Sequence, residues 1–118
     1  MRYDGGVGGT KRIFSYEEAR QLVPAVRSRT KEALAALAAT TGGDAADAEE
    51  ARERLERAGA EILGAWARDI EALGIEVKGP WLVDFDSGAG YYCWKWPEES
   101  LEFFHGYEEG FAGRVRIQ

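Results

Sequence analysis

The first half of the chain shows the hydrophobic period of α-helices. From Ala19 onward, apolar side chains recur every three or four positions, so they form a stripe along one helix face. Ser15 and Glu18 have the spacing of a capping box, which marks where a helix begins. Gly42-Gly43 is a typical helix end, and Asp44 is a typical N-cap for a second helix. The pattern predicts helices over residues 15–41 and 44–73.

The short turn between the predicted helices requires an antiparallel hairpin. This hairpin would place Pro24, which kinks a helix because it lacks a backbone N–H, opposite Gly59. The second helix also carries a face rich in glutamate and arginine, which is typical of a solvated surface. Several apolar residues lie beside the main stripes, and contact with a second copy would bury them: Leu22, Leu34, Ala35 and Leu63.

After Leu73 the apolar spacing changes from the helical period to the alternation of β-strands. We therefore predict an α+β fold, in which a long antiparallel two-helix hairpin packs on a three- to four-stranded antiparallel β-meander. A single domain covers residues 12–118, and the glycine-rich residues 1–11 form a flexible tail. The strand segments indicated by the pattern are 75–78, 81–86, 91–96, 101–105 and 114–117.

Two short loops predict how the strands pair. The glycine-rich loop after the second strand segment pairs Phe85 with Tyr92, and this register collects the apolar residues on one face. The same register places Asp84 and Cys93 on the other face. A second turn of equal length pairs His105 with Tyr92, so it places His105 on the apolar face.

Composition and charge exclude some classes of partner. The chain has 15 Lys and Arg against 21 Asp and Glu, a formal net charge of −6 and a pI of 4.9. This balance opposes binding to nucleic acid and to anionic membranes, which both require clustered positive charge. No apolar run approaches the roughly 20 residues of a membrane-spanning helix. The lone cysteine fits a reducing compartment, so we expect a cytoplasmic protein without nucleic-acid or membrane partners.

His105 is the one histidine of the chain and the first candidate for chemistry. With Glu108 and Glu109 it would form a metal site if the segment were helical, because residues three and four positions apart share a helix face. These ligand types indicate a divalent transition metal. Gly106 opposes a helix at this point. The alternative is a histidine at a strand end that packs on Tyr92 and binds no cofactor.

Arg114 and Glu98 are further candidates for a catalytic site with His105. Arg114 follows a Gly-Phe-Ala-Gly segment, whose backbone N–H groups could contact an anion together with the guanidinium group. The simpler interpretation is an ion pair between Arg114 and a carboxylate such as Glu98 or Glu109.

Cys93 and the nearby aspartates also have simple interpretations. Asp84 and Asp86 share one strand face, where a carboxylate pair can bind a cation or transfer protons, although aspartates beside a turn are more often only solvated. Cys93 faces an acid and an aromatic ring, which favours an unreactive thiol that serves in packing. The predicted register separates Asp84 and Cys93 from His105, so it predicts no cluster of the three.

Several segments of the chain, in fixed order from Ile13 to Ile117, resemble one protein family. They are Phe14-Ser15-Tyr16-Glu17-Glu18-Ala19, Leu22-Val23-Pro24, Gly74-Ile75-Glu76-Val77-Lys78, Leu82-Val83-Asp84-Phe85, Tyr92-Cys93-Trp94-Lys95, Phe104-His105 and Gly110-Phe111-Ala112-Gly113-Arg114. Together they resemble the bacterial and archaeal family catalogued as domain of unknown function twenty-two zero three. The chain departs from the family pattern at Asp86, Pro97-Glu98 and Phe104. The resemblance implies no reaction, substrate or cofactor.

The sequence supports two hypotheses of different class. The first is a non-enzymatic interaction module without a cofactor, which self-associates through its helix hairpin, for example as a dimer, and binds an unidentified protein. It rests on the lack of a nucleophile–base pair, a dense ligand cluster or a phosphate loop in the sequence. The alternative is a small metal-dependent or anion-binding enzyme that uses His105 with nearby glutamates and Arg114. Convergence of His105, Glu98 and Arg114 in one pocket would favour the enzyme.

Overall fold

The computed structural model describes residues 12–40 and 48–117. Within them the chain forms two helices, α1 (Tyr16–Ala39) and α2 (Ala48–Glu71), followed by a five-stranded sheet. The predicted flexible tail and the predicted Gly42-Gly43 helix end lie outside these residues.

Helix α1 begins with the capping box that the sequence indicates. The Glu18 N–H donates to Ser15 Oγ at 3.1 Å, and the Ser15 N–H donates to Glu18 Oε1 at 2.9 Å. Two backbone donors that have no partner within the helix are satisfied in this way, which fixes where the chain enters α1.

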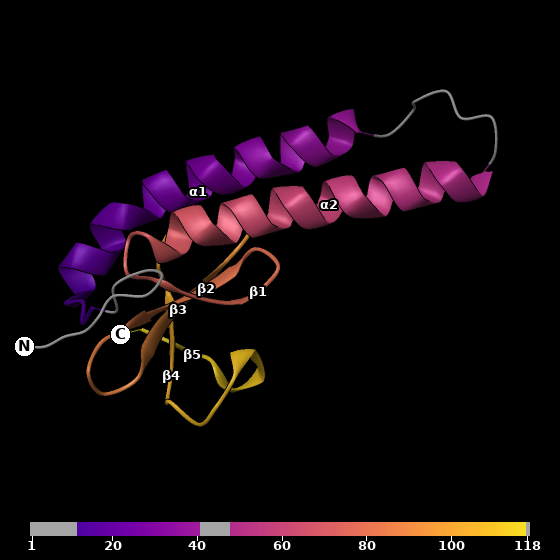
Figure 1. Ribbon diagram of the computed structural model, residues 1–118. Coiled ribbons are helices and arrows are strands. Elements are labelled where there is room, and N and C mark those ends of the chain that lie inside the picture. Colours follow the sequence, from indigo (N-terminus) through magenta and orange to yellow (C-terminus); the bar gives the residue numbers. More distant parts are fainter. Residues whose placement is uncertain (1–11, 41–47, 118) are drawn as a thin grey trace, which may run out of the picture.

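The helices lie antiparallel, as predicted, but in a different register (Figure 1). The buried indole N–H of Trp66 donates to Thr30 Oγ1 at 2.9 Å, so these residues lie opposite each other. A Cβ atom on Gly59 would meet Leu37 at 3.6 Å, and Pro24 is not among its neighbours within 4 Å. The prediction that Pro24 faces Gly59 was therefore wrong. Gly59 faces Leu37 instead, thirteen residues further along α1, because the buried contact of Trp66 with Thr30 sets the register and the positions of the helix ends do not.

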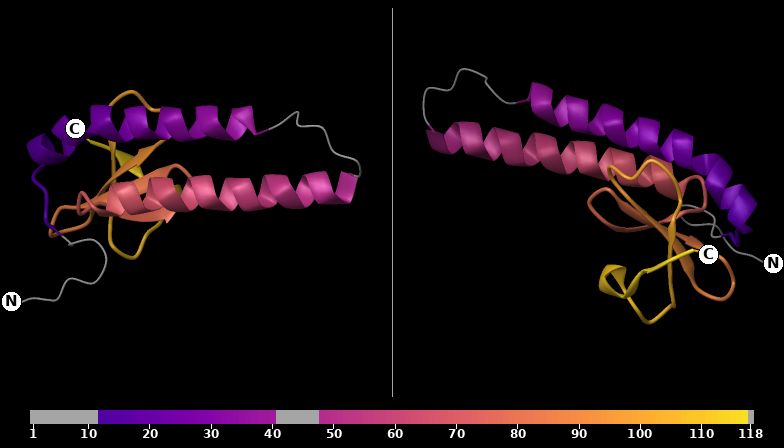
Figure 2. Two further views of the ribbon diagram at one scale, coloured as in Figure 1. Left: turned by 45° about the horizontal axis from the view of Figure 1, so that its top comes forward. Right: turned by 180° about the vertical axis from the view of Figure 1, so that it is seen from behind.

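The sheet is an antiparallel meander in which each strand pairs with the next in the chain. It has five strands, more than the three or four predicted, and a short 3₁₀ turn (Phe111–Gly113) precedes the last. The strands are β1 (Glu76–Gly79), β2 (Leu82–Asp86), β3 (Tyr91–Lys95), β4 (Phe103–His105) and β5 (Val115–Arg116). The hairpin covers one face of this sheet, so the α+β fold class is confirmed (Figures 1 and 2).

The core lies between the hairpin and the sheet face that carries Val83, Phe85 and Trp94. Phe14, just before α1, packs its ring edge-to-face on Phe85 with the centroids 5.3 Å apart. Each such buried side chain stabilises the fold by about 1.5–3 kcal/mol. The remaining buried members of this core are Ala19, Val23, Val26, Trp66, Ile70, Ile75 and Leu101.

The hairpin extends well beyond the sheet (Figures 1 and 2). The buried residues of both helices lie toward the sheet, up to Thr30 in α1 and from Trp66 onward in α2. Residues 31–39 of α1 and 48–65 of α2, which we call the distal hairpin, contain no buried residue in the part of the chain that the structure describes. The distal helices therefore contact each other but are not covered by the sheet.

The predicted register between β2 and β3 is confirmed. Phe85 pairs with Tyr92, Val83 with Trp94, and Asp84 with Cys93. Because successive side chains of a strand alternate between faces, the aromatic residues point toward the helices and Asp84 and Cys93 point away from them.

The predicted register between β3 and β4 is wrong by one residue. His105 pairs with Tyr91 instead of Tyr92. Glu98 explains the difference, because it folds the connection back on β3: its N–H donates to the Lys95 carbonyl at 2.9 Å, and its side chain accepts the Lys95 N–H at 2.9 Å. The connection is therefore not a simple four-residue turn, and the shift moves His105 to the face turned away from the helices.

The buried Thr30–Trp66 hydrogen bond provides a test of the observed helix register. We expect Thr30→Val to lower the free energy of unfolding by about 1–3 kcal/mol, since it leaves the buried indole N–H without an acceptor. Thr30→Ser keeps the hydroxyl group and should cost less. Urea unfolding measures both variants. If Thr30→Val lowers the free energy of unfolding as much in a Trp66→Phe background as in the wild type, the two residues do not interact and the observed register is contradicted.

Candidate functional site

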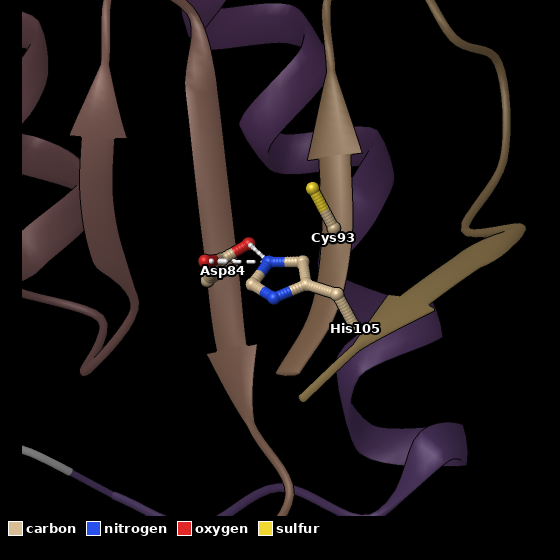
Figure 3. A group of neighbouring side chains, drawn as sticks. All are labelled: Asp84, Cys93 and His105. Atoms are coloured by element: carbon tan, nitrogen blue, oxygen red, sulfur yellow. Dashed lines mark hydrogen bonds and ion pairs between the residues drawn. The ribbon is translucent and has the colours of Figure 1, made fainter. Parts of the chain in front are cut away.

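Three chemically competent side chains meet on the sheet face turned away from the helices (Figure 3). Asp84 of β2 and Cys93 of β3 are direct cross-strand partners, and His105 reaches them from β4. Their exposed fractions are only 2%, 1% and 4%, so the group is buried despite its polarity. We call Asp84, Cys93 and His105 the outer cluster.

Hydrogen bonds hold His105 at both of its ring nitrogens. Nε2 lies 3.0 Å from Asp84 Oδ2 and 3.1 Å from Oδ1, and Nδ1 lies 2.8 Å from the carbonyl oxygen of Gly106. Both neighbours are acceptors when Asp84 is ionised, so both bonds form together only when each ring nitrogen carries a hydrogen. His105 is thus oriented toward Asp84, with its second nitrogen anchored on the backbone.

The Cys93 thiol is not set up as a nucleophile. Burial raises the pKa of Cys93 from its ordinary 9.0 to about 12, and the nearby Asp84 carboxylate acts in the same direction. Arg114 opposes this shift only weakly, with Nη1 4.0 Å from the sulfur. Both His105 nitrogens have other partners, so the cluster lacks the cysteine–histidine contact that activates a thiol.

Two cations flank the outer cluster, and each has a carboxylate partner of its own. Lys78 Nζ lies 3.9 Å from Asp84 and 3.3 Å from Glu76. Arg114, beside Cys93, lies 2.8 Å from Glu98. Each of these cations is therefore already paired with a carboxylate other than Asp84.

The segment between β4 and β5 covers the outer cluster. The Arg114 guanidinium group lies over the rings of Phe103 and Phe111, at 4.0 and 4.1 Å from their centroids. Tyr107 packs edge-to-face on Tyr91 and donates a hydrogen bond of 2.6 Å to Asp86. Aromatic and cationic side chains from the C-terminal segment therefore keep water away from the cluster.

The candidates from the sequence occupy different places. Glu98 and Arg114 form the simple ion pair, and this pair lies at the Cys93 side of the cluster. Glu108 is exposed, and the Glu109 carboxylate accepts the Gly106 N–H at 2.9 Å. The residues after His105 form a turn instead of a helix, so the structure does not bring these two glutamates to the imidazole.

Asp84 and Cys93 are the residues of the site that sequence reasoning missed as partners of His105. The signal was present in part, since their pairing with each other was predicted. A shift of β4 by one residue was all that separated the predicted arrangement from the cluster. Among the residues that the structure describes, these are the one group of three potential metal ligands whose ligand atoms all lie within 4.8 Å of one another.

A second candidate is a surface on α2 of the distal hairpin. Apolar residues recur there at alternating intervals of four and three, which is the spacing of a helix–helix seam. Leu55 is 39% exposed and Ala65 is exposed, and the other members are only half-buried. We call this set the α2 seam: Ala51, Leu55, Ala58, Ile62 and Ala65.

The raised pKa of Cys93 predicts a pH dependence of stability. The folded state keeps the thiol proton up to about pH 12, whereas the unfolded state loses it near 9.0, so stability is full below pH 9 and falls above it. We expect this loss, up to about 1.4 kcal/mol per pH unit, to be absent from Cys93→Ala. Urea unfolding of both proteins with a chelator present measures it. Parallel stability curves above pH 9 would contradict the assigned environment.

No helix of the described residues is long and apolar enough to cross a membrane. Comparison with curated proteins and with solved structures gave no match. The model of one family, described as "Uncharacterized conserved protein (DUF2203)", matches residues 12–117, which is almost the whole chain. The resemblance seen in the sequence is thereby confirmed, and the chain belongs to this family.

Proposed function

We propose that this chain is a non-enzymatic interaction module that forms a homodimer through the α2 seam. The observation that carries the proposal is the uncovered state of the distal hairpin, where the apolar period of α2 continues beyond the sheet without a buried residue. An amphipathic helix gains most of its stability by burying its apolar face, so a face left uncovered favours a further contact.

A second copy of the same surface is the partner that the α2 seam fits. Ala51, Ala58 and Ala65 follow at seven-residue intervals, so two backbones can approach closely along this line. Leu55 and Ile62 lie between them and supply apolar bulk along the same line. A two-fold axis makes each copy offer the same patch, as in most homodimers.

Charges beside the seam agree with an antiparallel contact. If two α2 helices cross at Ala58, Arg54 of each copy comes beside Glu61 of the other, because the two positions lie almost equally far from the crossing point. Both residues line one groove together with Arg57 and with three seam residues, Ala51, Leu55 and Ala58. The antiparallel arrangement therefore brings Arg54 and Glu61 of opposite copies together, which favours it over a parallel one.

The free thiol of Cys93 supports a cytoplasmic location for this module. The thiol is free and buried, and a reducing compartment maintains such a group without oxidation.

Ala58→Glu tests the proposed dimer, because it places two carboxylates near the two-fold axis. We expect the wild-type protein to sediment as a dimer, and the variant to dissociate at least about tenfold more readily. Sedimentation equilibrium over a range of concentrations measures both, and circular dichroism checks that the helices are kept.

Ala60→Glu is the matched control, since Ala60 is exposed and lies on nearly the opposite side of α2. It should dimerise as the wild type does. Arg54→Glu should weaken the dimer, and the added Glu61→Arg should restore it. A monomeric wild-type chain, or equal effects of the substitutions at positions 58 and 60, would refute the proposal, and a complex only with a different protein would do so too.

A further inference from the structure

We propose that Asp84, Cys93 and His105 bind a divalent transition metal ion of the zinc class. The three residues come from three adjacent strands, and their side chains lie together on the outer face of the sheet; in Figure 3 the Asp84 and His105 side chains point toward each other, and the Cys93 side chain lies beside them. No two of their ligand atoms are more than 4.8 Å apart. This set differs from the glutamates beside His105 that the sequence suggested.

The spacing of the ligand atoms suits a small ion. Bonds of about 2.0–2.3 Å in a tetrahedral site put neighbouring ligand atoms about 3.3–3.8 Å apart. The His105 Nε2 atom lies 3.0 and 3.1 Å from the two Asp84 oxygens. It needs to move away from them by only about a few tenths of an ångström. The Cys93 sulfur already lies within 4.8 Å of the other ligand atoms, so a movement of about 1 Å brings it to the same spacing.

The donor types select the class of metal. A thiolate and an imidazole are ligands of Zn²⁺, Fe²⁺ and Co²⁺, whereas Mg²⁺ and Ca²⁺ take oxygen ligands almost exclusively. One carboxylate beside one thiolate supplies two negative charges, which match a divalent ion. Three protein ligands leave one tetrahedral position to a water molecule or a small ligand.

Each ligand also has the kind of neighbour that orients metal ligands. His105 Nδ1 is 2.8 Å from the Gly106 carbonyl oxygen, the usual partner of the nitrogen that does not bind the metal, and this turns Nε2 inward. Arg114 Nη1 lies 4.0 Å from the Cys93 sulfur, where an N–H group can support a thiolate. Lys78 lies 3.9 Å from Asp84.

The flanking charges leave room for the ion. Lys78 and Arg114 would repel a cation if they were unpaired, but Glu76 lies 3.3 Å from the first and Glu98 lies 2.8 Å from the second. The two pairs cancel locally, so Asp84 and the Cys93 thiolate remain to balance the metal charge.

A Co²⁺ titration tests the site directly, because Cys93 is the chain's lone cysteine. Protein prepared without chelator or affinity metal is analysed for bound metals, stripped, and titrated with Co²⁺. We expect about one metal ion per chain, a thiolate-to-cobalt charge-transfer band, and loss of this band when Zn²⁺ is added. A metal-free preparation that also gives no such band at a large molar excess of Co²⁺ would overturn the proposal.

Single substitutions assign the ligands. Cys93→Ser should abolish the charge-transfer band, and Asp84→Asn and His105→Gln should each weaken Co²⁺ binding at least about tenfold. Glu108→Gln is the control, since Glu108 is exposed and outside the cluster, and should bind as the wild type does. Because a variant could fail to fold, the wild-type thermal midpoint is also measured with and without Zn²⁺, which should raise it. Unchanged binding in folded Asp84→Asn or His105→Gln, or an unchanged midpoint, would contradict the assignment.

Discussion

The close approach of β4 to the start of β3 determines where most of the chemically active side chains lie. A Cβ atom on Gly90 would come within 2.4 Å of Phe104 Cζ and 2.8 Å of the His105 carbonyl oxygen, so only glycine permits this contact. With the strands this close, His105 lies beside Tyr91 and projects from the outer face. Phe104 projects from the other face, where it packs on Tyr92 with the ring centroids 5.7 Å apart.

The elements that could be predicted are those whose signals are local. The capping box at Ser15 and the alternation on either side of the glycine-rich loop each depend on residues close together in the chain, and both are present in the structure. The position of β4 depends on Glu98, which uses its backbone and its side chain to fold the connection onto Lys95. Spacing does not reveal such bonds, since a glutamate in a turn is equally compatible with a solvated side chain.

The candidate site shows the same division. His105 could be singled out because the chain has no other histidine, and the Arg114–Glu98 pair follows from simple charge pairing. The partners of His105 could not be found, because their place beside it depends on a strand register with no local signal. The helix register could not be predicted for a related reason: it follows from side-chain contacts such as that of Thr30 with Trp66, which the spacing of apolar residues does not reveal.

The sheet separates two regions that share almost no side chains. One face belongs to the hydrophobic core under the hairpin, and the other carries the outer cluster and the segment that covers it. A substitution in the distal hairpin touches neither the strands nor the residues that hold His105. The surface of the distal hairpin can therefore change without any rebuilding of the core or of the outer cluster.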